Sequence, residues 1–181
     1  MVFDDTLAQI LSLQQRKPAA ALSPRLDALF HKLAAGADDP MAFEIEDEIW
    51  EAWTGHPDPD LAARMNQAIA AIAACDYDRG RTILNDLVAR APDYAEAWNK
   101  LATLEFLAGR DRESVAAIAR TLELEPRHFG AISGFAQICL RNGDPGSARL
   151  AFEAALRLNP RLTAVRIAVE ELNRTHPATL H

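Results

Sequence analysis

The sequence predicts an all-α solenoid in which helical hairpins of one length stack side by side. Three observations support this fold class. Pro92, Pro126 and Pro160 recur at intervals of 34 residues, apolar residues recur in phase between them, and Gly109 and Gly143 share one position of the interval. A fixed period of this length is typical of a repeat architecture, in which neighbouring units bury a continuous core.

Placing the three prolines at the same position of a unit gives repeats at 61–94, 95–128 and 129–162. Within each unit, apolar residues stand at i, i+3 and i+4, the spacing of amphipathic helices. Gly109 and Gly143 occupy the fifteenth position, where a glycine can adopt the left-handed conformation that ends a helix. Each unit is therefore expected to be a helical hairpin.

Residues beside the turns are suited to start the following helix. Asp111 and Asp144 are expected to be N-caps of second helices, and Pro145 fits a first helical turn. Asp93 and Glu96 form a D-x-x-E variant of the capping box, which predicts the start of a first helix.

The stretches "AWNKLATLEFLAGRDRESVAAIARTLELEP" (97–126) and "AISGFAQICLRNGDPGSARLAFEAALRLNP" (131–160) resemble the tetratricopeptide repeat (TPR) family. Both follow its order of an aromatic or aliphatic residue, Leu-Ala or a similar pair, Gly, a small residue and a closing Pro. The unit 61–94 departs from the pattern at Arg64 and Gln67, where apolar residues are usual. The resemblance implies a right-handed superhelix of antiparallel hairpins that binds other proteins.

The segments beside the repeats are expected to close the ends of the solenoid, because a terminal apolar face would otherwise meet water. Residues 162–176 predict a C-terminal capping helix, and residues 23–58 predict a degenerate acidic hairpin that serves as the N-terminal cap. Residues 1–22 hold an amphipathic segment and a linker. Within them, the helix expected at 3–16 has three possible positions: its own groove, the groove of a neighbour in a homo-oligomer, or a loose tail.

The resemblance implies that the first helices line a concave groove. The candidate partner-binding residues on that face are mostly apolar, with neutral hydrogen-bonding groups between them: Met65, Ile69, Ile72, Asn99, Thr103, Phe106, Ser133, Gln137 and Leu140. Such a surface suits an amphipathic helix or an extended peptide. The alternative is that these residues pack against another part of the same chain.

A groove that holds a C-terminal carboxylate, as some TPR proteins have, needs cations at positions where this chain has Met65, Gly130 and Gly134. We therefore do not expect that kind of ligand. The acidic run 44–53 has two interpretations, a docking surface for a basic partner or a solvated helix face.

Charge and hydropathy exclude further classes of protein. The net charge is −7, and residues 1–60 hold twelve Asp and Glu against four Lys and Arg, which argues against a nucleic-acid binder. No apolar run approaches the roughly 20 residues of a membrane span. Asp4 and Asp5 stand where a secretory signal would carry positive charge, which predicts a cytoplasmic protein; a periplasmic one would follow if a signal peptide had been removed.

Catalytic and metal-binding patterns are missing from the sequence. Cys75 and Cys139 have no metal-ligand spacing and are expected to be small packing residues, and the five histidines are scattered, as surface or loop residues would be. We expect no enzyme activity, cofactor or metal. Two functions remain: an adaptor that binds a peptide or helix of a partner, or a structural subunit of a larger assembly or oligomer.

Overall fold

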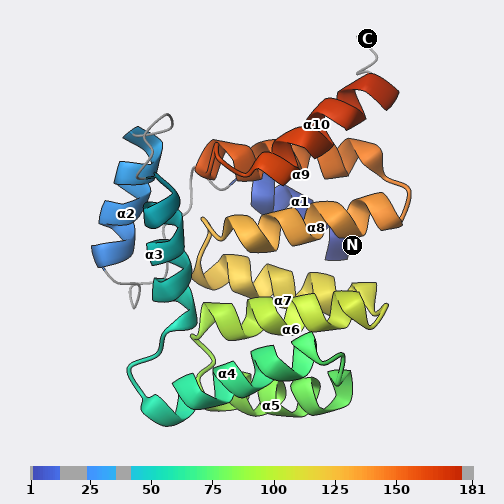
Figure 1. Ribbon diagram of the computed structural model, residues 1–181. Helices are drawn as coiled ribbons and strands as arrows, with labels where there is room; N and C mark the ends of the chain where they lie inside the picture. Colours follow the sequence, from blue (N-terminus) through green and yellow to red (C-terminus); the bar gives the residue numbers. More distant parts are fainter. Residues whose placement is uncertain (1, 13–23, 36–41, 177–181) are drawn as a thin grey trace.

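The computed structural model describes residues 2–12, 24–35 and 42–176, and these contain ten helices and no strand. Figure 1 shows most of them stacked in parallel rows. In chain order they are α1 (Val2–Leu11), α2 (Pro24–Ala35), α3 (Ala42–Thr54), α4 (Pro59–Ala73), α5 (Tyr77–Arg90), α6 (Ala95–Leu107), α7 (Asp111–Leu124), α8 (Phe129–Arg141), α9 (Pro145–Leu158) and α10 (Thr163–Thr175).

The six helices from α4 to α9 form three hairpins, and the two helices of each hairpin pack closely against each other. Helices α4, α6 and α8 form one layer and α5, α7 and α9 the other (Figure 1). Gly109 and Gly143 both have φ of +75°, so the expected left-handed helix ends are confirmed. In the first hairpin Cys75 holds the same position with φ of 58°, a conformation that costs a residue with a Cβ free energy.

The helix starts agree with the sequence in part. The Asp144 side chain accepts a hydrogen bond from Ser147 N, and Pro145 opens α9, as expected. The capping box at Asp93 and Glu96 is wrong, because Tyr94 is the N-cap of α6 and makes no side-chain capping bond. The N-cap of α7 is Arg110, one residue before the expected Asp111.

Large apolar side chains fill the space between the two layers. Leu84, Leu104, Ile118, Phe135 and Phe152 are all buried there. Trp98 is an exception: the sequence pattern places it among the packing residues, but it is only partly buried, and its indole Nε1 donates to Pro92 O at 3.1 Å.

Helix α1 packs on the side of the second helices, against α7 and α9. Ile10 is buried there, the Phe3 and Phe135 rings lie 6.2 Å apart, and Gln9 Nε2 donates to Ala119 O at 3.2 Å. The N-terminal helix therefore does not fill the groove of its own first helices, which was one of the three expected positions. Residues 13–16 of that expected helix lie outside the described residues.

Helices α2 and α3 pair with each other and lie across the N-terminal ends of α6 and α8 (Figure 1). Rings of α2, α3 and α8 meet at this junction: Phe30 lies 6.4 Å from Phe129, and Trp50 lies 5.3 Å from it. Helices α2 and α3 therefore do not stack in front of α4 as a further repeat would; they pack at the ends of later helices. The hydroxyl of Tyr94 donates to the carbonyl of Thr54 and ties the end of α3 to the start of α6.

Helix α10 packs on α9 and follows α8 in the stack. Val165 and Leu172 are its buried contacts, whereas Ile167 is 59% exposed. Among the described helices, none is both long and apolar enough to cross a membrane.

Candidate partner-binding groove

A pocket of about 110 Å³ opens on the layer of first helices, between α6 and α8. Its lining includes Asn99, Thr103, Phe106 and Gln137, which are four of the groove residues expected from the sequence. The geometry therefore brings these four side chains to one place.

Small residues make the floor of the pocket. Ala102 comes from α6, and Gly130, Ala131 and Gly134 come from α8. A Cβ atom at Gly134 would meet only Ile118 Cδ1, at 3.8 Å, which is an ordinary contact. The hollow exists because the residues of this turn of α8 that line it are Gly or Ala, and its apolar lining suits an aliphatic group of a ligand.

The polar groups around the pocket differ in whether they are free to form a hydrogen bond with a ligand. Thr103 Oγ1 donates to Asn99 O at 3.0 Å, and buried Ser114 Oγ donates to Ala102 O at 2.7 Å. Gln137 is exposed, and its amide has no hydrogen bond to a described residue. Gln137 is therefore the side chain best placed to pair with the backbone of a bound peptide.

The remaining predicted residues are distributed along the same layer. Met65 is 0% exposed, so its expected role in contacting a partner is wrong: it belongs to the core. Ile69 and Ile72 lie on α4, partly buried, and Ser133 and Leu140 lie on α8 outside the lining of the pocket.

Asn99 is 7% exposed because it belongs to a buried polar network at the junction with α3. Its amide Nδ2 donates to Glu96 Oε2 at 3.0 Å, and His128 Nε2 lies 2.8 Å from the same oxygen. Lys100 Nζ lies 2.8 Å from the other oxygen, Glu96 Oε1. Burial alone would raise the pKa of the Glu96 carboxyl, but the hydrogen bond to His128 and the charges of His128 and Lys100 hold this pKa below its ordinary value.

His128 lies in the loop between α7 and α8, which agrees with the expectation of surface or loop histidines, but it is not at the surface. Its side chain is fully buried and caps α8 by accepting from Ala131 N at 3.2 Å. Its ring also stacks on Trp53, with centroids 4.0 Å apart and planes at 12°. This histidine joins α3, α6 and α8, which histidine spacing in the sequence does not reveal.

Trp50 of α3 packs on Gly130, which is one of the residues that line the pocket. A Cβ atom at Gly130 would lie 2.6 Å from Trp50 Cη2, so only a glycine admits the indole at this distance. Lys100 Nζ lies 5.7 Å from the centre of the same ring. Gly130 holds a position that the resemblance assigns to the groove, whereas the repeat pattern gives no sign of its contact with Trp50.

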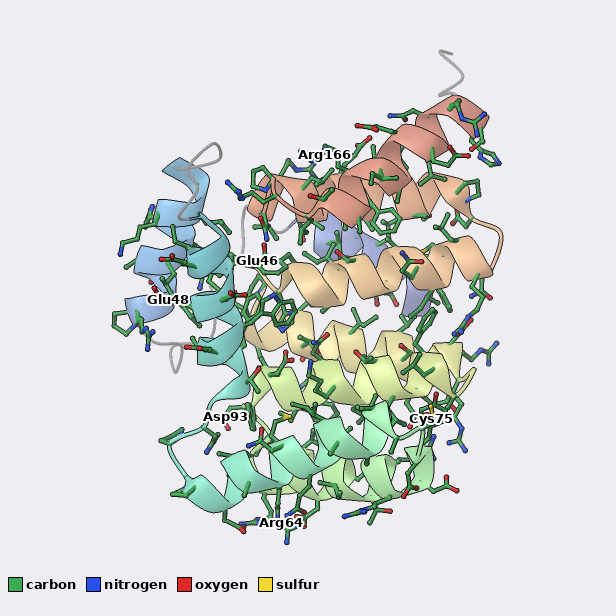
Figure 2. All side chains as sticks on the ribbon, in the orientation of Figure 1. Glu46, Glu48, Arg64, Cys75, Asp93 and Arg166 are labelled. Carbon is green, nitrogen blue, oxygen red and sulfur yellow. The ribbon has the colours of Figure 1, made fainter. Side chains whose placement is uncertain are left out.

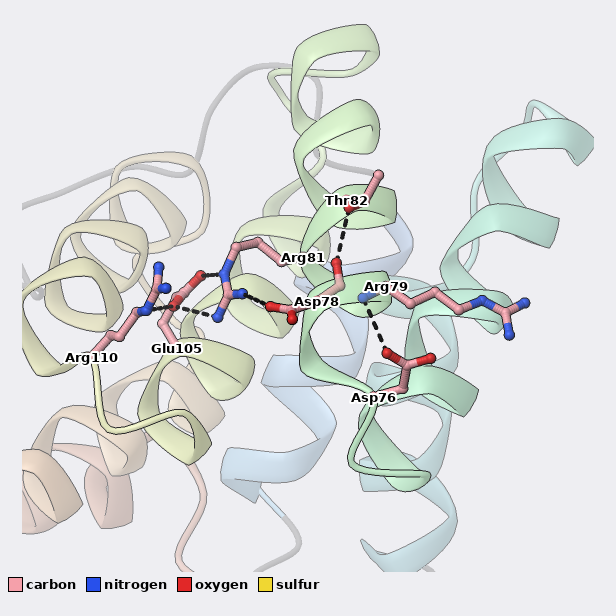
Figure 3. Close-up of polar contacts among 7 residues, drawn as sticks. All are labelled: Asp76, Asp78, Arg79, Arg81, Thr82, Glu105 and Arg110. Carbon is pink, nitrogen blue, oxygen red and sulfur yellow. Dashed lines mark hydrogen bonds and ion pairs between the residues drawn. The ribbon is translucent and has the colours of Figure 1, made fainter.

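A second cluster of charges lies away from the groove, between α5 and α6 (Figure 3). Glu105 is 4% exposed and receives two hydrogen bonds from Arg81, at 2.6 Å from Nε and 3.2 Å from Nη2, while Arg110 Nε lies 3.8 Å away. Arg81 is therefore the main partner of this carboxylate, and Arg110 lies farther from it. The cluster is internally compensated and serves packing.

The two cysteines also differ. Cys139 is buried as expected, and its burial raises the pKa of the thiol to about 12. Cys75 is exposed, so its expected packing role is wrong. Within the part of the chain that the structure describes, no group of three or more His, Cys, Asp or Glu side chains is placed to hold a metal ion.

The fold is a solenoid of helical hairpins with a pocket on the layer of its first helices. The tetratricopeptide repeat family model matches residues 65–128 and 112–163. A TPR repeat-containing protein of Rhizobium etli is 35% identical over 161 residues, which cover 89% of this chain and 78% of that protein. The chain belongs to the tetratricopeptide repeat family.

Solved structures support the same fold. A structure described as "MamA MSR-1 C2" aligns with a TM-score of 0.53 at 18% identity, over 84% of this chain and 87% of the other. One described as "MamA AMB-1 C2221" aligns with a TM-score of 0.52 at 19% identity, over 84% and 89%. At this level of identity the likeness concerns the fold.

Proposed function

We propose that this protein is a non-catalytic protein–protein interaction module that binds a segment of a partner across α6 and α8. The observation that carries the proposal is the pocket between these helices. It is apolar at its floor, bordered by Phe106, and open beside Thr103 and Gln137. An aliphatic or aromatic side chain of a partner would enter the pocket, and Gln137 would pair with the backbone next to it.

The alternative in which the N-terminal helix fills a groove gains no support, since α1 packs against α7 and α9 of its own chain. The alternative of a structural subunit predicts binding through the second-helix side or through α2 and α3. An experiment that compares faces distinguishes these possibilities.

A photo-crosslinking amino acid placed at Thr103 or Gln137 reports on the concave face, and the same amino acid at Glu113 reports on α7. All three positions are exposed. In cells that naturally express the protein, we expect a crosslinked partner from the first two positions and not from Glu113. Adding Gly134→Leu, which fills the pocket, should remove that product. A product from Glu113 alone would favour the structural subunit.

A further inference from the structure

The acidic helix α3 borders the groove, which gives the groove a charge that its floor lacks. Helix α3 carries five carboxylates, Glu44, Glu46, Asp47, Glu48 and Glu51, and no Lys or Arg. One of them, Glu48, pairs with Arg25 of α2 at 3.2 Å. The other carboxylates of α3 can attract a basic ligand only if they face the groove and no nearby cation neutralises them.

The charges on the floor are already compensated within the fold. Lys100 pairs with Glu96, as described above. At the other end of α8, Arg141 forms an ion pair with Asp111 and lies 3.9 Å from the centre of the Phe106 ring. These pairs leave no cation of the groove floor free to balance α3.

The flank of α3 beside the groove can be located from Trp50, which packs on Gly130. Glu46 lies one helical turn before Trp50 and therefore shares this flank. Figure 2 shows Glu46 on the side of α3 toward α8, and Glu48 on the side toward α2. Asp47 is exposed next to it, and neither Glu46 nor Asp47 forms an ion pair with a described residue.

The packing of α3 shows how a helix can lie against this end of the layer of first helices. Helix α3 itself crosses the N-terminal ends of α6 and α8, and its Trp50 approaches the α8 backbone where Gly130 has no side chain. Next to it, the pocket continues along α8 to Gly134 and Gln137. A second helix beside α3 would therefore meet an apolar pocket below and two uncompensated carboxylates on one side.

We propose that the segment bound in this groove is a basic amphipathic helix. Its apolar face places an aliphatic side chain in the pocket between α6 and α8, and Lys or Arg residues on its flank pair with Glu46 and Asp47 of α3. The proposal rests on the concave groove being the binding site, as proposed above, and adds the charge and the form of the partner. Charge complementarity at the rim would steer the partner and select against acidic helices.

Two synthetic helical peptides of 14 residues test the proposal. They share one Leu face and differ only in carrying Lys or Glu beside it. Fluorescence anisotropy should give a Kd for the Lys peptide at least about tenfold lower than for the Glu peptide, with the difference shrinking at high salt. The double variant Glu46→Lys/Asp47→Lys should weaken binding of the Lys peptide by about tenfold or more.

The matched control is Glu113→Lys/Glu153→Lys, which makes the same charge change on α7 and α9 and should leave the Kd within about twofold. Equal affinity for the two peptides, or an equal effect of the two double variants, would overturn the basic preference. If Gly134→Leu still abolished binding in that case, the groove would stand as the binding site. Failure of both peptides to bind would overturn the inference, while the crosslinks at Thr103 and Gln137 test the groove separately.

Discussion

Replacing Gly130 by alanine tests the packing that holds α3 against the solenoid. The new Cβ would lie 2.6 Å from Trp50 Cη2 and 3.3 Å from Trp50 Cζ2. Carbon atoms pack best at about 3.5–4.0 Å, so the indole would have to retreat by roughly 1 Å. Trp50 cannot retreat freely, because Trp53 and Phe129 lie 5.2 and 5.3 Å from it, measured between ring centres.

Overpacking of this kind costs about 1–3 kcal/mol. Gly134→Ala is the matched control, since the same substitution one turn later adds a Cβ at 3.8 Å from Ile118 Cδ1, in ordinary contact. In the interior of a helix that change should stabilise by about 0.5–1 kcal/mol, because alanine loses less backbone entropy than glycine. The two variants should therefore shift the free energy of unfolding in opposite directions and differ by about 2–3 kcal/mol.

Urea unfolding followed by circular dichroism measures this difference, and tryptophan fluorescence reports on Trp50 and Trp53 directly. We expect Gly130→Ala to unfold at lower urea with a perturbed emission spectrum, and Gly134→Ala to unfold at higher urea with a native spectrum. Equal stability of the two variants would refute the close contact between Trp50 and Gly130, and with it the packing of α3 beside the pocket.

Three further substitutions test other parts of the structure. Cys75→Gly should stabilise by about 1 kcal/mol in thermal unfolding, because glycine adopts the positive φ of this position without strain, whereas Cys75→Ala should give no gain. Arg81→Ala leaves the buried Glu105 carboxylate with Arg110 at 3.8 Å and should cost about 2–3 kcal/mol, while Arg79→Ala, beside it and exposed (Figure 3), should change stability by less than about 0.5 kcal/mol. The pKa of Glu96 is lower in the folded protein than its ordinary value of 4.5. The ionised carboxylate therefore stabilises the fold fully above pH 4.5, and this stabilisation is lost as the pH falls through the lowered pKa. Glu96→Gln should therefore make the free energy of unfolding in urea depend less on pH below about 4.5, and Glu113→Gln should not; equal slopes for the two variants would contradict the network.

The repeats could be predicted from the sequence because each helix packs mainly on its neighbours in the chain. Gly109 and Gly143 mark the turns of the hairpins, and the apolar spacing marks the faces that meet. The positions of α1, α2 and α3 could not be predicted in this way. They depend on contacts between residues about a hundred positions apart, such as Arg127 with Asp27 and Gln9 with Ala119, and no local pattern encodes them.

The residues of the candidate site could be predicted only in part. The resemblance to the tetratricopeptide repeat family assigns Thr103, Phe106 and Gln137 to the groove face, and all three line the pocket. The pocket itself depends on Gly130 and Gly134, whose positions can be recognised in the sequence, but only the packing reveals that their missing side chains leave a hollow. The resemblance also assigns Met65 to the groove face, but neighbouring residues bury it, which only the packing reveals.

The measurement that tests the central claim most directly is the affinity of Gly134→Leu for the partner recovered by crosslinking. The substitution adds a Cβ atom in ordinary contact with Ile118 Cδ1, at 3.8 Å, and an isobutyl group to fill the pocket of about 110 Å³. The proposed groove predicts a Kd at least about tenfold higher than for the unsubstituted protein, at an unchanged thermal midpoint. An unchanged Kd would show that the partner binds elsewhere on the protein.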